Sequence, residues 1–222
     1  MGRSNLILSM KVSQLTQQEL IVQVEIAVQA ALSIPELTTA FQGSGIDENK
    51  IQVGRTLTQE VIIWQDRQTG AANNLHVAQT TFRTTKEKIN SLYTRHLEVA
   101  RFLYREDEEM RRTLQLAGAR RTRFADWIEQ VRTFYARLNV KALAPLGVSG
   151  KEINEAKTMI SQLAELQVLR NDARRQSQQT TRSKQMAVND LRAWFRRFVN
   201  ASEFVCQEDP QLLESMGIVV PS

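Results

Sequence analysis

Apolar residues recur every three or four positions over two long stretches of the chain, and this spacing predicts two long helices. In the first stretch the seam covers fourteen positions in one register, and eleven of them hold apolar residues. Its members are Leu57, Val61, Trp64, Gln68, Ala71, Leu75, Ala78, Phe82, Thr85, Ile89, Leu92, His96, Val99 and Leu103. Alternating spacings of four and three are typical of a helix that packs along another helix. We therefore predict one helix over about 47–105 and a second, on the equivalent seam, over about 149–207.

A hairpin turn at 69–74 is the alternative to one long first helix. This segment contains Gly70 and two asparagines, which are plausible helix-stopping residues. The equivalent segment 171–176 has no glycine or proline, and a seam that keeps one register is hard to explain across a turn. We therefore favour the continuous helix.

The two long stretches are related by a fixed offset of 102 residues. Segment 45–51 aligns with 147–153, and 102–107 aligns with 204–209, without a gap between them. Only 9 of the 72 aligned positions from 45 to 116 are identical, so the sequence leaves a chance likeness open. Apolar character is nevertheless kept at Tyr93/Phe195, Leu97/Val199, Phe102/Phe204, Leu103/Val205, Met110/Leu212, Leu114/Met216 and Leu116/Ile218. This predicts a duplication, with helical repeat A over 14–117 and helical repeat B over 122–218.

Shorter helices are expected before each long one. Apolar spacing predicts a helix over 14–33 in repeat A and its counterpart over 124–138 in repeat B. The segments that follow, 34–45 and 139–147, contain proline and glycine and are predicted to be loops that differ in length by four residues.

Each repeat is predicted to close with a third, short helix after Asp107 or Asp209. Aspartate is a good N-cap, and Pro210 fits the first helical position, where its missing N–H is harmless. Gly217 is expected to end the second of these helices.

The last part of the chain carries a resemblance. Segment 208–218 reads EDPQLLESMGI and follows an aromatic-rich WFRRF run at 194–198. In this it resembles uncharacterised bacterial tandem-repeat helical proteins with an EDPQLLE-type C-terminal ending. The resemblance covers nearly the whole chain but rests mainly on that ending, and repeat A departs from it because 105–110 lacks the proline. It implies a bacterial origin and the duplicated helical fold, and it implies no activity.

Composition agrees with the helical pattern. The chain has 222 residues, with 42% hydrophobic and 24% charged residues and only four prolines. We expect an elongated, dumbbell-like all-α protein in which two pseudo-repeats form helical bundles joined by a long antiparallel helix pair.

Features that bear on location favour the cytoplasm. Cys206 is the single cysteine, so no intramolecular disulfide forms, and we expect it to fill space in a core. The N-terminal segment 1–8 has an apolar patch of three residues, too short for a secretion signal or a membrane span. Gly2 lacks the Ser or Thr at position 6 that the myristoylation pattern requires. We expect a cytoplasmic protein without a membrane partner.

The sequence contains no recognisable catalytic, cofactor or metal constellation, so none is predicted, and an enzyme is only a third and weaker reading. Di-iron bundles need Glu-x-x-His pairs, and neither His76 nor His96 has a glutamate three residues before it. No glycine-rich phosphate-binding run is present. We expect His96 to be a core residue with a satisfied nitrogen, the alternative being a pH-sensitive contact. The tryptophans Trp64, Trp127 and Trp194 are expected to pack in the core.

The net charge of +5 is unevenly distributed. One basic cluster consists of Arg111, Arg112, Arg120, Arg121 and Arg123. A second consists of Arg170, Arg174, Arg175, Arg182 and Lys184 and surrounds the lone acid Asp172. Both are suited to an anionic partner, and a solvated helix face is the alternative. We choose the second cluster as the candidate partner-binding stripe.

These observations predict a non-enzymatic structural or adaptor protein that binds a protein partner of unknown identity. The alternative is a nucleic-acid-associated protein that uses the same basic stripe. No aromatic residue lies in 170–184, so contact with a nucleic-acid backbone is favoured over base recognition. Self-association stays open, because seam residues such as Phe82 have no evident cover on a two-helix pair.

Overall fold

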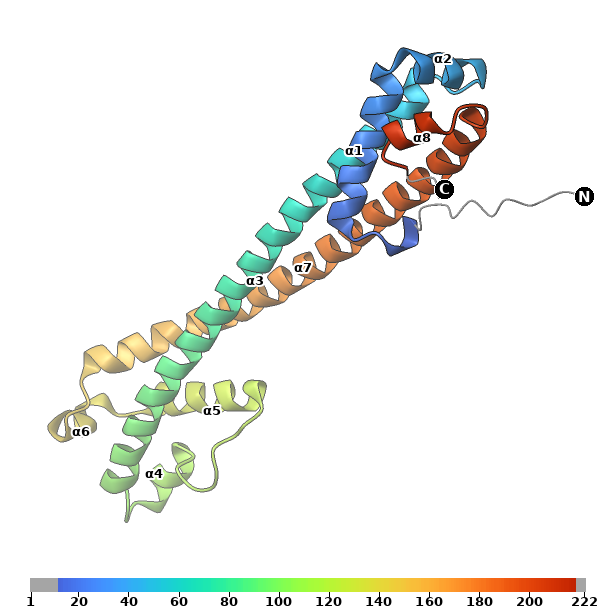
Figure 1. Ribbon diagram of the computed structural model, residues 1–222. Coiled ribbons are helices and arrows are strands. Elements are labelled where there is room, and N and C mark those ends of the chain that lie inside the picture. Colours follow the sequence, from blue (N-terminus) through green and yellow to red (C-terminus); the bar gives the residue numbers. More distant parts are fainter. Residues whose placement is uncertain (1–11, 219–222) are drawn as a thin grey trace, which may run out of the picture. The chain divides into compact units, whose positions relative to one another are not determined.

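The computed structural model describes residues 12–218, and the regular elements in that range are all helical (Figure 1). They are the 3-10 helix η1 (Val12–Gln14), α1 (Gln17–Ser33), α2 (Pro35–Gly43), α3 (Glu48–Leu103), α4 (Glu108–Thr113), α5 (Phe124–Arg137), α6 (Val140–Leu143), the 3-10 helix η2 (Ala144–Leu146), α7 (Gly150–Val205) and α8 (Gln211–Ser215). The predicted all-α class is therefore confirmed for this part of the chain. The N-terminal segment 1–8, from which a location was predicted, lies outside the described residues.

The two long helices agree with the prediction to within two residues. α3 and α7 contain 56 residues each, and α3 continues through Gly70 without interruption, so the hairpin alternative is wrong. Both helices have a side-chain cap at the start. Asp47 accepts a hydrogen bond from the backbone N–H of Lys50 at 2.9 Å, and the Ser149 hydroxyl accepts one from the N–H of Glu152 at 3.2 Å. These caps satisfy backbone donors that the first helical turn leaves free.

The chain forms two compact units, and their boundaries cut across the repeats seen in the sequence. Among the described residues, unit 1 consists of 12–71 and 177–218, and unit 2 consists of 72–176. Each unit therefore combines part of α3 with part of α7 and adds its own short helices.

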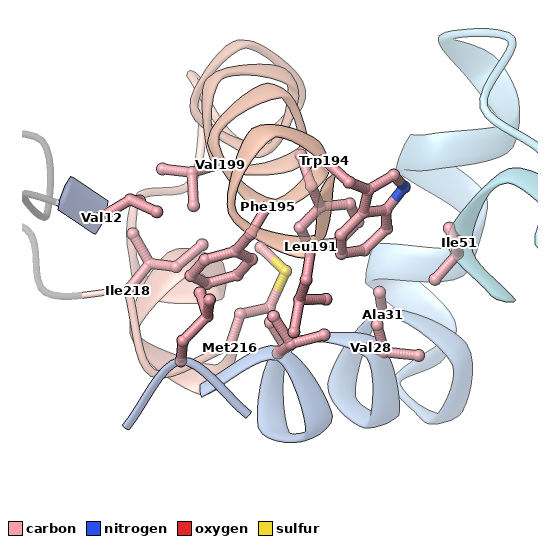
Figure 2. Close-up of a cluster of buried hydrophobic side chains, with 14 of the residues drawn as sticks. Val12, Val28, Ala31, Ile51, Leu191, Trp194, Phe195, Val199, Met216 and Ile218 are labelled. Carbon is pink, nitrogen blue, oxygen red and sulfur yellow. The ribbon is translucent and has the colours of Figure 1, made fainter. Parts of the chain in front are cut away.

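In unit 1, the first part of α3 packs against the second part of α7 in antiparallel fashion. Gly54 faces the Trp194 ring, and fourteen residues further along α3 the Gln68 amide donates to the Thr181 hydroxyl at 3.1 Å. Figure 2 shows Leu191, Trp194 and Phe195 of α7 pointing into the same core as Ala31 and Met216. An apolar core on one stripe of each helix is what drives this packing.

Aromatic stacking adds to the core of unit 1. The Phe198 ring lies between two others, with ring centroids 5.0 Å from Trp194 and 5.5 Å from Phe41. Both pairs are stacked. Of the three tryptophans predicted to lie in the core, Trp194 and Trp127 are buried, and Trp64 is partly buried with the Arg67 guanidinium 4.8 Å from its ring centroid.

Unit 2 has a separate core in which α5 covers the seam between α3 and α7. The Tyr93 ring of α3 meets the Phe134 ring of α5 edge-on, with centroids 5.2 Å apart, and Phe134 in turn meets Tyr135. The antiparallel sense is the same as in unit 1, because Arg95 of α3 pairs with Glu152 near the start of α7.

The segments predicted as loops between the first and second helices are largely helical. α2 occupies most of 34–45, and α6 with η2 occupies most of 139–147. The physical reason lies in the residue that starts each helix. Pro35 stands in the first turn of α2, where a proline is well accommodated, and the Asn139 side chain accepts a hydrogen bond from the N–H of Ala142 at 3.4 Å.

The predicted length difference between these segments is also corrected. α1 and α5 end at Ser33 and Arg137, 104 residues apart, and each is followed by an extended residue. Gly45 and Gly147, both with positive φ, are 102 residues apart. The two segments therefore differ by two residues rather than four.

The short closing helices follow the predicted signals, with one shift. The Asp107 carboxylate caps α4 by accepting from the N–H of Met110 at 2.9 Å. α8 begins at Gln211, so Pro210 stands at the N-cap rather than at the first helical position. Gly217 has a φ of 70° after α8, which agrees with its predicted role as a stop.

A glycine pair in α3 allows a test of the packing in unit 1. A methyl group added at Gly54 would collide with the Trp194 ring, whereas one added at Gly70 would meet nothing within 4 Å. We expect Gly54→Ala to destabilise the protein, because overpacking costs about 1–3 kcal/mol and exceeds the roughly 1 kcal/mol gained in helix propensity. Gly70→Ala should stabilise it by about 1 kcal/mol. Urea unfolding followed by circular dichroism measures both, and a gain of stability in Gly54→Ala equal to that in Gly70→Ala would contradict the packing.

Candidate interaction surfaces

The five basic residues predicted as a partner-binding stripe are divided between the two units. Arg170, Arg174 and Arg175 belong to unit 2, and Arg182 and Lys184 belong to unit 1. Two of them already have intramolecular partners, since the Arg170 guanidinium lies 4.2 Å from the Phe82 ring centroid and Arg175 pairs with Asp172 at 3.0 Å. The remaining three, Arg174, Arg182 and Lys184, form no hydrogen bond or ion pair with other residues of the described range 12–218.

The expectation that Phe82 lacks a cover is wrong. Its side chain is only 6% exposed and belongs to the core of unit 2. The Phe124 ring, at the start of α5, lies with its centroid 5.3 Å away, and the Arg170 guanidinium covers another side. Phe82 therefore gives no reason to expect self-association.

An apolar hollow lies between α3 and α7 within unit 2. It has a volume of about 250 Å³ and is lined by Asn74, Val77, Ala78, Thr81, Leu166 and Leu169. Val77 is 62% exposed and Leu169 is 58% exposed, although both are large apolar residues. Exposed apolar side chains that gather around one hollow are typical of a contact surface rather than of scattered surface residues.

Sequence reasoning missed this hollow because Val77 and Leu169 lie one position before the seam residues Ala78 and Arg170. The seam pattern describes a single row of side chains and says nothing about the residues beside it. The signal that was available is the apolar pair Val168 and Leu169, directly before the basic cluster.

Basic side chains continue the same row of α7. Residues four apart lie one above another on a helix, so Leu166, Arg170 and Arg174 share one side of α7. Leu166 lines the hollow, Arg170 covers Phe82, and Arg174 is exposed without an intramolecular partner. The hollow is therefore bordered by positive charge.

A polar network centred on the buried His96 lies elsewhere in unit 2 and joins α3, α5 and, through the Arg95–Glu152 pair, α7. His96 is fully buried, with its Nδ1 2.9 Å from the Tyr135 hydroxyl and its Nε2 3.2 Å from Arg95 Nη2. Because a guanidinium only donates, Nε2 must accept from Arg95, and this assigns the proton of the neutral ring to Nδ1, which donates to the tyrosine oxygen. The prediction that His96 is a core residue with a satisfied nitrogen is confirmed.

The network also fixes the charge states of its members. Burial, followed by the nearby Arg95, lowers the pKa of His96 below its usual value of 6.5. A hydrogen bond from Arg95, followed by one from the backbone N–H of Ser149, lowers the pKa of Glu152 to about 2. Burial raises the pKa of Tyr135. At neutral pH the network thus holds an ionised Arg95–Glu152 pair, a neutral imidazole and a neutral phenol.

Cys206 behaves as predicted, as a space-filling residue. It is buried in the core of unit 1, and this burial raises the pKa of its thiol. A raised pKa reduces the thiolate fraction, which is the reactive form.

Residues 12–218 contain neither a metal site nor a single membrane-spanning helix. Within this range no group of three or more His, Cys, Asp and Glu side chains is placed to hold a metal ion. No helix of the described chain meets the length and hydropathy of a membrane span by itself; α1 and α2 meet them only when taken together, across a bend of 87°.

Comparison of the chain with known protein families, with curated proteins and with solved structures gave no match. The resemblance to bacterial tandem-repeat helical proteins stays a prediction.

The His96 network predicts a pH dependence of stability. The unfolded chain takes up a proton on this histidine below about pH 6.5, whereas the folded chain resists it, so stability falls as pH drops through that range. We expect urea unfolding to show a loss of stability between about pH 7.5 and about pH 5.5 that is smaller in His96→Phe. Glu152 does not contribute there, because its pKa falls from an ordinary value of 4.5 to about 2 in the folded state, so it alters stability only below about pH 4.5.

The matched control is His76→Gln, at an exposed position of α3 outside this network. It should keep the pH dependence of the wild type. An unchanged pH dependence in His96→Phe would contradict the assignment of a neutral, buried imidazole.

Proposed function

We propose that this protein is a non-enzymatic structural or adaptor protein that binds another protein through the apolar hollow of unit 2. The supporting observation is the exposure of Val77 and Leu169 around a hollow on the surface of an otherwise well-packed helix pair. A groove between two helices accepts the apolar face of a third helix, which inserts side chains spaced three and four residues apart.

The charge beside the hollow defines the partner further. Arg174 has no intramolecular partner, and it lies on the same row of α7 as Leu166, eight residues further on and about 12 Å along the axis at ~1.5 Å per residue. An amphipathic helix of the partner with a carboxylate about two turns from its apolar anchors would pair with Arg174. The proposed occupant is therefore an acidic amphipathic helix of another protein.

The internal duplication is part of the same proposal. It is supported by the bounds of the long helices, since Glu48–Leu103 and Gly150–Val205 differ by 102 residues at both ends. Residues with positive φ recur at the same offset, as Gly45 and Gly147 and as Gln115 and Gly217. Gln115 is the one non-glycine residue with positive φ in the described chain, and it stands where the other repeat has glycine.

We further propose a cytoplasmic location, because the single cysteine is buried and free. The elongated arrangement of two bundles stays a prediction of the sequence.

Crosslinking tests the hollow directly. A photoreactive amino acid placed at position 77 should form a covalent adduct with one partner in the native cell, and that partner can then be purified. We expect Val77→Glu/Leu169→Glu to weaken its binding at least about tenfold. The two carboxylates would have to give up their hydration at the centre of an apolar contact, and this costs free energy.

The control is Val22→Glu/Met186→Glu, which introduces two charges at exposed apolar positions of unit 1. This variant should bind like the wild type. Absence of any adduct at position 77, or equal affinity of the hollow variant and the wild type, would reject the proposal. Circular dichroism of each variant verifies that the helices are intact.

Association with nucleic acid is the second candidate, and the three basic side chains without intramolecular partners favour it. A gel-shift series with duplex DNA in rising salt tests it. If it holds, binding falls steeply with salt, because each phosphate contact releases a counterion, and Arg174→Glu/Arg182→Glu/Lys184→Glu abolishes the shift. No shift at low salt would reject this candidate.

A further inference from the structure

A second hollow lies in unit 2, at the segment that joins α4 to α5, and its lining is strongly basic. Its volume is about 780 Å³, which is within the range of small-molecule sites. The charged residues of its lining are Arg111, Arg112, Arg120, Arg121, Arg123 and the single acid Asp126. The structure thus gathers the whole first basic cluster of the sequence around one concave surface, which we name the arginine hollow.

The segment that carries these arginines is held in place by side chains of α3 and α5. Arg101 of α3 donates through Nε to the carbonyl of Leu116 at 2.9 Å. Gln130 of α5, only 8% exposed, accepts from the backbone N–H of Arg121 at 3.1 Å. Arg137, at the end of α5, donates to the carbonyl of Thr113 at 3.2 Å. The buried side chain of Leu116 anchors the segment to the core, so the arginine hollow is built on a fixed backbone.

Most of the positive charge in the arginine hollow is not neutralised within the described chain. The side chains of Arg121 and Arg123 form no hydrogen bond or ion pair with any residue of 12–218, and the one hydrogen bond of Arg120 goes to the neutral hydroxyl of Thr94. Arg112 pairs only loosely with Glu108, at 3.6 Å between exposed groups. α5 also begins here without a side-chain cap, and the free N–H groups of its first turn add to the positive potential.

We propose that the arginine hollow binds a small molecule that carries at least two linked phosphate groups. Guanidinium groups match phosphate oxygens with paired hydrogen bonds, and several of them around one concavity suit a ligand with more than one negative charge. The lining contains no aromatic residue on which a base would stack. We therefore expect the arginine hollow to recognise the phosphates and not any base attached to them. This site is separate from the apolar hollow, and its test does not depend on the proposed protein partner.

Isothermal titration calorimetry of the full chain with inorganic pyrophosphate tests the proposal. Wild type should bind pyrophosphate, and adenosine diphosphate should bind with similar affinity, whereas adenosine should not bind. Arg121→Gln/Arg123→Gln should weaken pyrophosphate binding at least about tenfold, since hydrogen bonds between charged groups are among the strongest in proteins. Both residues are exposed, so the variant is expected to keep its fold, which circular dichroism verifies.

The matched control, Arg174→Gln/Arg182→Gln, removes the same charge from exposed positions of α7 outside the arginine hollow. It should keep pyrophosphate affinity within about twofold of wild type, because neither side chain lines the arginine hollow and screening weakens the effect of exposed charges outside it. Equal losses in both variants would mean a general charge effect and would overturn the proposal. So would the absence of measurable pyrophosphate binding by the wild type, or binding of adenosine as tight as that of its diphosphate.

Discussion

The packing of α3 against α7 along a narrow apolar seam is the constraint on which both units depend. A single helix buries only one stripe of its surface, and two paired helices still leave the edges of their seam exposed to water. Each unit therefore needs further helices to close its core. α1, α2 and α8 supply this cover in unit 1, and α5 supplies most of it in unit 2.

The two units meet this constraint with different chemistry. Unit 1 relies on close apolar packing. Gly54 lets α3 approach the Trp194 ring, this ring stacks on Phe198, and Phe198 stacks on Phe41. Unit 2 instead buries polar groups. His96 of α3 donates to Tyr135 of α5, and its neighbour Arg95 donates to His96 and pairs with Glu152 of α7. Buried polar groups must be satisfied with defined geometry, so this network specifies one arrangement of α3, α5 and α7 more narrowly than apolar contact does.

The sequence predicted those features that depend on local or periodic signals. The seam register located α3 and α7, and Asp107 and Gly217 marked α4 and the end of α8. Helices α2 and α6 were not predicted, because they are too short to show a repeating apolar pattern. Their starts depend instead on Pro35 and Asn139. The interaction surfaces could not be predicted in this way, because they depend on contacts between residues far apart in the sequence. Nothing local indicates that Arg170 covers Phe82, or that Arg101 and Gln130 fix the backbone beneath the arginine cluster. The sequence shows that this cluster is basic, but it does not predict that the arginines surround a concave surface.

The boundaries of the compact units have a consequence for the order in which the chain folds. Unit 2 is one continuous stretch, 72–176, whose partners all emerge from the ribosome within about a hundred residues of one another. Unit 1 joins residues before position 72 to residues after 176, so its core stays incomplete until synthesis has passed both. During that interval the apolar faces of α1 and early α3 have no native partner on α7. Closing so large a loop is entropically unfavourable for a free chain. The core of unit 1 therefore carries a larger entropic cost of loop closure than the core of unit 2, which forms from one continuous stretch of chain.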